Sequence, residues 1–240
     1  MLSRIYSAGL FGIDGFPVTV EVDAQNRLDY FEVVGLPDAA VKEAKERVRT
    51  ACENTGYPFP ECSLLINLAP ADRRKEGSGF DVAILTGILS AVGVIRSTVR
   101  LNDKCFVGEL SLSGELRPVR GVLSMCVAAR DAGLTEFYTS MENAPEAAAV
   151  EGISVYGVPS MRVLLDHLNG RRVLAPLPRS APRPPRPIPT AWIFPTSRGK
   201  PRLSAPWRSP RRADTTFCSS ALPARENPCW PSGFPPFSLP

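Results

Sequence analysis

The turn at residues 71–79 carries the residue types that could bind an anion. Its candidate anion- or nucleic-acid-binding residues are Arg73, Arg74, Lys75, Gly77, Ser78 and Gly79. Backbone N–H groups at a helix start, the helix dipole and three cations could converge there on an anion. The alternative is a solvated turn whose glycines supply positive φ. The turn lacks the G-x-x-x-x-G-K-[ST] spacing, so it is not a P-loop.

Ser78 is the one candidate nucleophile in this turn. A serine needs a positioned base to attack a substrate, and Lys75 is the only nearby candidate. A cap on the following helix is the simpler role for Ser78. We therefore expect no catalytic residue in this chain.

Other ionisable residues do not form a recognisable site. His167 is the only histidine and has no Asp or Cys partner in a motif, which predicts a surface or boundary position. Glu109 and Glu115 flank a strand and turn, where a solvated face is expected. Cys52, Cys62, Cys105 and Cys126 lack C-x-x-C spacing, so we expect buried thiols and no metal site.

Two apolar segments must position the turn. Residues 63–68 lack charge and lie between Pro60 and Pro70, which predicts a central strand covered on both faces. Residues 80–92 have no polar stripe, which predicts a buried helix that Ser78 caps and Gly93 ends.

The other elements alternate along the first 170 residues. Residues 3–11, 17–22 and 29–34 predict an antiparallel meander of three strands. A helix then starts at Pro37-Asp38, with Val41, Ala44, Val48 and Ala51 facing inward and Lys42, Glu43, Glu46 and Arg47 facing water. Further strands are expected at 104–110, 137–139 and 153–156, and helices at 121–132, 144–150 and 160–168. This order indicates an α/β fold with a mixed sheet.

Charge and composition change sharply near Gly170. Residues 171–240 contain 17 of the 25 prolines and a net charge of +10, whereas residues 1–170 have a net charge of −6. An acidic body argues against a nucleic-acid footprint on it. The Pro- and Arg-rich tail has no apolar periodicity, and this composition predicts disorder.

Three segments of the body resemble one family. Met1-Leu2-Ser3-Arg4-Ile5-Tyr6-Ser7-Ala8-Gly9-Leu10, residues 31–43 and Asn67-Leu68-Ala69-Pro70-Ala71-Asp72 are similar to the amino-terminal domain of bacterial magnesium-chelatase-like AAA+ ATPases of the ComM/YifB type. The resemblance covers residues 1–170. It implies that full-length relatives carry a further motor domain that binds ATP and magnesium, forms a ring, and is linked to DNA branch migration in natural transformation.

The same domain resembles the proteolytic domain of Lon proteases, and residues 106–121 look like the strand and turn before the Lon catalytic lysine. In this resemblance Gly79 stands at the position of the catalytic serine and Leu123 at that of the lysine. Neither can activate a nucleophile. The resemblance therefore implies a non-proteolytic domain of Lon-protease C-terminal-domain-like fold.

The tail fits a shifted reading frame. If each codon is regrouped from the third base of one residue and the first two of the next, Trp192-Ile193 gives Asp and Trp230-Pro231 gives Ala. From Ser220 onward the shifted frame permits, without forcing, G-P-P-G-x-G-K-S-M-L-A-K-R-L-P, a Walker A motif. We expect that a frameshift between about residues 171 and 188 replaced the start of the ATPase domain.

The sequence thus predicts a non-catalytic accessory domain separated from its motor. A Lon-like serine peptidase using Ser78 and a nucleic-acid-binding module using residues 73–75 or the tail remain alternatives. No cofactor is expected in this chain, ATP and magnesium belonging to full-length relatives. Expected partners are the AAA+ motor domain and possible DNA contacts, with a ring only when the motor is present. The chain lacks a signal peptide and a long apolar run, so a cytoplasmic location without membrane contact is expected.

Overall fold

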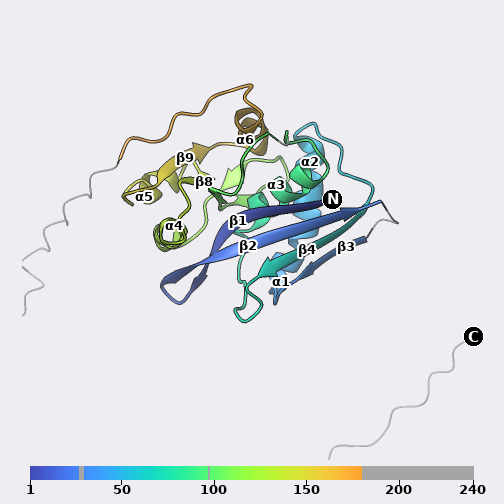
Figure 1. The fold of residues 1–240 in the computed structure, drawn as a ribbon, viewed down its shortest axis with the longest axis horizontal. Coiled ribbons are helices and arrows are strands. Elements are labelled where there is room, and N and C mark those ends of the chain that lie inside the picture. The colour runs from blue at the N-terminus through green and yellow to red at the C-terminus, as the bar shows by residue number, and fades with distance from the viewer. Residues whose placement is uncertain (27–29, 97, 180–240) are drawn as a thin grey trace, which may run out of the picture. The chain divides into compact units, whose positions relative to one another are not determined.

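A seven-stranded mixed sheet forms the central layer of the computed structural model, which describes residues 1–26, 30–96 and 98–179 (Figure 1). All of these residues belong to the first of two units of the chain, 1–186. The sheet order is β3-β4-β2-β1-β5-β8-β9. The strands are β1 (Leu2–Phe11), β2 (Asp14–Gln25), β3 (Tyr30–Val34), β4 (Ser63–Ala69), β5 (Lys104–Phe106), β8 (Glu136–Ser140) and β9 (Ser154–Val158).

The sheet is antiparallel in its middle and parallel toward both edges. β2 pairs antiparallel with β1 and with β4, while β3 pairs parallel with β4 and the pairs β1–β5, β5–β8 and β8–β9 are parallel. A separate two-stranded ribbon joins β6 (Glu109–Leu110) and β7 (Leu116–Arg117). The mixed α/β architecture predicted from the sequence is confirmed.

Helices pack on both faces of the sheet. They are α1 (Ala39–Lys42), α2 (Ala44–Asn54), α3 (Asp81–Ala91), α4 (Val122–Asp131), α5 (Ala144–Ala147) and α6 (Met161–Leu168). One core cluster joins α2, α3 and α6 to the sheet face that contains Ile5 and Val20. A second joins α4 and α5 to the opposite face, around Ala8 and Phe137. Because neighbouring strand residues point to opposite faces, the two clusters lie on either side of the sheet.

Several predicted elements are confirmed. Helix α3 is buried over nearly its whole length, and Gly93 follows its end with φ 82°. The inward positions predicted for the helix after Pro37, Val41, Ala44, Val48 and Ala51, are all buried. The helix predicted at 121–132 is observed as α4, which buries Val122, Met125, Cys126 and Ala129. The spacing of apolar residues was sufficient for these predictions, because it decides which face of a helix packs against the core.

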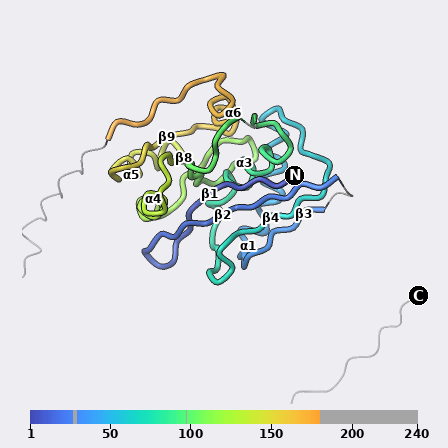
Figure 2. The backbone as a smooth tube through the Cα atoms, viewed as in Figure 1, coloured from blue at the N-terminus to red at the C-terminus, as the bar shows by residue number. Residues whose placement is uncertain are grey.

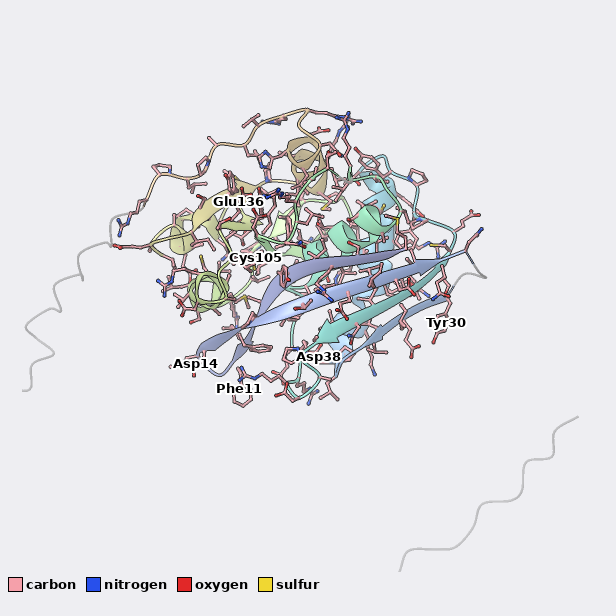
Figure 3. All side chains as sticks on the ribbon, in the orientation of Figure 1. Phe11, Asp14, Tyr30, Asp38, Cys105 and Glu136 are labelled. Carbon is pink, nitrogen blue, oxygen red and sulfur yellow. The ribbon has the colours of Figure 1, made fainter. Side chains whose placement is uncertain are left out.

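The predicted meander is wrong in its third strand. β1 and β2 form the expected hairpin, whose tip carries the paired residues Phe11 and Asp14 (Figure 3). β3, however, pairs with β4 and not with β2. β4 enters between β2 and β3, because long-range pairing and not chain order decides the neighbour.

The predicted two-sided burial of β4 is also wrong. β4 is paired on both edges, but its burial alternates, with Leu64, Ile66 and Leu68 buried and Leu65 41% exposed. Figure 1 shows that none of the helices in the described residues covers the other face of β4 and β3. Residues 63–68 therefore form a strand that is buried on one face only, although none of them is charged.

Smaller differences concern element ends. The helix expected after Pro37 is divided at Glu43 into α1 and α2, and the strand expected at 104–110 is divided into β5 and β6. Ser78 does not cap α3, whose N-cap is Phe80 without a side-chain bond. Arg47 does not face water, because it binds a buried carboxylate.

The chain stays attached to the body beyond Gly170. Leu174 and Leu177 pack against the two core clusters, and the Leu177 N–H donates to the Val155 carbonyl at 2.8 Å. Figure 2 shows this segment returning from α6 along β9 toward α5. The predicted boundary at Gly170 thus precedes two packed residues. The predicted disordered tail from residue 180, with its shifted-frame Walker A stretch, lies outside the described residues.

No helix in the described ranges is both long and apolar enough to span a membrane.

Candidate functional site

A cleft of about 610 Å³ opens at the turn that the sequence singles out. Residues 76–80, just before α3, form one wall, and residues 118–120, just before α4, form another. The rest of the lining comes from Ala8 and Leu10 of β1, Gly12 of the hairpin turn, Glu109 of β6 and Met125 of α4. The predicted residues Gly77, Ser78 and Gly79 therefore all face one cavity.

Ser78 is bound to a carboxylate in this cleft. Its Oγ donates a hydrogen bond to Oε2 of Glu109, whose other oxygen lies 3.8 Å from Nη1 of Arg117. Glu109 is only partly exposed, so it does not occupy the solvated position predicted for it. The Ser78 hydroxyl is thus fixed by a neighbour that the sequence did not connect with it.

Lys75 is fully buried and cannot serve as the base for Ser78. Its Nζ donates to the carbonyl oxygens of Pro70 and Arg73, the latter at 2.8 Å. Burial lowers the pKa of Lys75. The ammonium group thus stabilises the loop of residues 70–75 and does not line the cleft.

The two arginines of the turn point to separate partners. The Arg73 guanidinium lies over the ring of Phe16, 5.2 Å from its centroid. The Arg74 Nε lies 3.7 Å from a carboxylate oxygen of Glu76. Residues 73–75 therefore do not converge on a common anion in this structure, although the glycines beside them line the cleft.

Gly79 and Leu123, which the resemblance places at the positions of the Lon catalytic serine and lysine, carry no reactive group. Gly79 is buried, and an added Cβ would come no closer than 3.9 Å to Val119. Leu123 lies in the first turn of α4 and is 42% exposed, with its N–H donating to Glu146 at 3.3 Å. The cleft wall has room for a side chain at Gly79, but it has no hydroxyl–amine pair there.

A buried ion pair fixes the wall that carries the turn. Asp81, at the start of α3, is 1% exposed and accepts two hydrogen bonds from Arg47 of α2, at 2.9 and 3.1 Å. The Leu110 N–H donates to the same carboxylate at 3.2 Å. Burial raises the pKa of Asp81 to about 6, opposed by Arg47. Asp81 is the single charged residue of an apolar, buried helix. A buried carboxylate needs a partner, so this charge is the feature of the sequence from which the ion pair could have been predicted.

His167 belongs to a hydrogen-bonded chain remote from the cleft residues in sequence. Its Nδ1 accepts the Leu174 N–H at 3.0 Å, so Nε2 carries the proton of the neutral ring and lies 3.1 Å from the Tyr138 hydroxyl. Tyr138 donates to Glu136 at 2.6 Å, and Lys104 also binds that carboxylate at 2.6 Å (Figure 3). Burial lowers the pKa of His167. The half-buried ring confirms the predicted boundary position.

The described residues contain no cluster of three or more His, Cys, Asp or Glu side chains that could hold a metal ion. Cys52, Cys105 and Cys126 are buried free thiols, and Cys62 is partly buried. Burial raises the pKa of Cys52 to about 11 and makes it a poor thiolate. The prediction of buried thiols is confirmed for three of these four residues.

The chain is similar to known proteins over its body. Residues 20–143 match the family model described as subunit ChlI of Mg-chelatase. An uncharacterized protein of Mycobacterium tuberculosis is 40% identical over 174 residues, and the competence protein ComM of Haemophilus influenzae is 38% identical over 173 residues. Each match covers 72% of this chain and 34% of the relative. The chain therefore corresponds to about one third of the length of these curated relatives.

A weaker similarity concerns Lon. The Lon protease of Heliobacterium modesticaldum is 31% identical over 121 residues, which is 49% of this chain and 14% of that protease. This similarity agrees with the resemblance of the body to Lon proteases. Because a shared fold does not imply a shared activity, catalytic ability must be judged from the residues that line the cleft.

Proposed function

This chain belongs to the family of subunit ChlI of Mg-chelatase, and on that premise we propose that its body is a non-catalytic accessory domain of a magnesium-chelatase-like AAA+ ATPase. The observation that carries the proposal is the state of the cleft. Gly79 and Leu123 cannot supply a nucleophile and a base, the Ser78 hydroxyl is bound to Glu109, and Lys75 is buried on carbonyl groups. The domain then acts by binding and not by chemistry.

The proposal extends to the role of full-length relatives. ATP and magnesium would bind to the motor domain of those proteins and not to residues 1–179 of this chain. A ring would form only with that motor. One relative is named a competence protein, and the family resemblance implies DNA branch migration in natural transformation, so we propose this role for the complete protein.

The two alternative functions receive less support. The Lon-like serine peptidase that the sequence leaves open pairs Ser78 with a lysine, but the nearby Lys75 ammonium is bound to the carbonyl oxygens of Pro70 and Arg73 and does not contact Ser78. A nucleic-acid-binding module on the body requires converging cations, whereas Arg73 and Arg74 contact Phe16 and Glu76.

Peptide cleavage separates the accessory domain from a peptidase. The full chain and its Ser78→Ala variant are incubated with casein and a fluorogenic peptide, with the Heliobacterium modesticaldum Lon protease as the active control. We expect no cleavage by either form of the chain. Cleavage by the full chain that disappears in Ser78→Ala would establish the peptidase instead.

Binding tests the accessory role itself. The part of Haemophilus influenzae ComM that this chain does not cover is produced separately and titrated with the full chain in a calorimeter. We expect a complex with a dissociation constant of about 1–100 μM, the range of weak domain contacts. Absence of heat and of co-elution at about 100 μM would refute docking on a motor.

A further inference from the structure

The two edge strands of the seven-stranded sheet, β9 and β3, differ in whether another segment of the body binds to them. At the β9 edge, the Leu177 N–H donates to the Val155 carbonyl, and the Leu177 side chain packs on the nearby core cluster. At the β3 edge, no segment within residues 1–26, 30–96 and 98–179 pairs with the outer side of the strand. An open edge presents unpaired N–H and C=O groups to any extended chain.

Leu36 follows this open edge in a strained conformation. It has φ 57° and is the only non-glycine with positive φ in the described ranges. Its side chain is 55% exposed. A branched apolar residue gains little from the left-handed region, so other interactions must impose this backbone.

Those interactions surround Leu36 on both sides. The Lys75 N–H donates to the Leu36 carbonyl at 3.2 Å, and the Asp38 N–H donates to the Lys75 carbonyl at 3.0 Å. The Asp38 carboxylate accepts from Gly77 N–H at 3.0 Å and caps α1. Gly35 lies so close to Leu68 that a Cβ would come within 2.2 Å of its carbonyl oxygen. The fold therefore holds an apolar side chain out into solvent on a rigid support.

A groove of about 570 Å³ adjoins Leu36 along β3. It is lined by β3, by the loop that follows and by two lysines of the helices, Lys42 and Lys45. Lys45 Nζ lies 5.7 Å from the centroid of the Phe31 ring. Neither lysine has a carboxylate within salt-bridge distance among the described residues. On a body of net charge −6, these two ammonium groups form a local positive site.

One acidic residue, Glu32, also lines the groove. Its carboxylate accepts the hydrogen bond of the Tyr30 hydroxyl, at the outer edge of the sheet (Figure 3). The register places Glu32 opposite Leu65, on the uncovered face of the sheet. The two lysines, on α1 and α2, therefore remain without a counter-charge from β3.

We propose that the β3 edge, Leu36 and the pair Lys42 and Lys45 form a docking site for an acidic extended segment of a partner protein. The segment adds a strand to the sheet through its backbone, places an apolar side chain against Leu36, and brings carboxylates to the two lysines. This inference rests on the proposed function, in that it names the surface through which a binding domain meets its partner.

The test uses the full chain and two labelled six-residue peptides, one alternating glutamate with valine and one alternating lysine with valine. Fluorescence polarisation measures binding, and amide chemical shifts of the chain locate it. We expect the glutamate peptide to bind about tenfold more tightly than the lysine peptide and to shift β3 amides. Equal binding of both peptides, or no binding of either, overturns the proposal.

Two variants make the test specific. Lys42→Glu combined with Lys45→Glu should reverse the order of the two peptides, because it exchanges the positive charges of the groove for negative ones. Lys42 is exposed and Lys45 is only partly buried, so the fold should tolerate both changes. Leu36→Asn suits the left-handed backbone and removes the apolar anchor, so it should weaken binding about tenfold while the melting temperature stays or rises. An unchanged order in the double variant, or unchanged affinity in Leu36→Asn, counts against the site.

Two further outcomes identify other occupants. Self-association of the chain that Leu36→Asn abolishes assigns the edge to a second copy and overturns the acidic-segment proposal. Glutamate-peptide binding without any complex with the remaining part of ComM refutes the proposed function and leaves this site in place.

Discussion

Replacing Arg47 with methionine is expected to lower the free energy of unfolding by about 3–5 kcal/mol at pH 7, the cost of leaving a buried charge without its partner. Methionine keeps most of the side-chain volume, so the loss is electrostatic and not a cavity. The Asp81 carboxylate, 1% exposed, would lose two guanidinium hydrogen bonds at 2.9 and 3.1 Å. Among the described residues, the Leu110 N–H would be the remaining hydrogen-bond donor to it.

The loss should depend on pH. Burial already raises the pKa of Asp81 to about 6 against the lowering effect of Arg47, so removing Arg47 raises the pKa further. The unfolded chain has an aspartate pKa of about 3.9. Between these values the folded variant holds the proton and the unfolded chain does not. Its free energy of unfolding therefore falls as pH rises, by up to about 1.4 kcal/mol per unit, and recovers as pH is lowered from 7 to 5.

Urea unfolding of the full chain, followed by circular dichroism at pH 5 and pH 7, measures both effects. Lys42→Met, an exposed position on α1, is the control and should change stability by no more than about 0.5 kcal/mol. Adding Asp81→Asn to Arg47→Met should recover part of the loss, because the neutral amide needs no counter-charge. The reasoning is refuted if Arg47→Met costs no more than the control, or if its cost is the same at both pH values.

Three further predictions follow from local geometry. Gly15→Ala should cost about 2 kcal/mol or more in urea unfolding, because its Cβ would lie 2.1 Å from the carbonyl oxygen of Ser124. Gly79→Ala, whose Cβ meets nothing closer than 3.9 Å, should stay within about 0.5 kcal/mol, and equal costs at the two glycines would contradict the packing of β2 on α4. Because the pKa of His167 is lowered in the folded protein, the free energy of unfolding should fall as pH drops below the unfolded pKa of about 6.5. Hydrogen exchange should show the Leu174 amide losing its protection first, since its N–H donates to His167 Nδ1. The variant His167→Phe should remove this pH dependence.

Sequence periodicity predicted the faces of elements but not their neighbours. The inward residues of α2 follow from the spacing within the helix, and the burial of α3 follows from its lack of a polar stripe. The position of β4 between β2 and β3 depends on pairing between segments about 30 residues apart or more, for which alternating apolar residues carry no signal. The same limit explains the uncovered side of Leu65, since a strand without charges looks the same whether one or two faces are buried.

A cleft lies at the turn that the sequence singles out, but the contacts of its polar side chains were not predicted. Glycines and a serine before an apolar helix mark a turn wherever they occur, so the cleft wall was predictable from local sequence. The partners of each polar side chain depend on residues that are distant in sequence or on a loop of particular shape. The Ser78 hydroxyl donates to Glu109, 31 residues away, and the Lys75 ammonium donates to the carbonyl of Pro70. The Arg47–Asp81 pair, 34 residues apart, was missed for the same reason.

The order of the strands has a consequence for how copies or partners could be arranged. β3 and β9 stand at opposite ends of seven strands, which at about 4.8 Å per step are roughly 30 Å apart. Residues 171–179 run beside β9, where the Leu177 N–H donates to the Val155 carbonyl. A strand added at β3 would therefore lie at the other edge of the sheet from this segment. The body thus has two unlike edges, one covered by its own chain and one open to a partner.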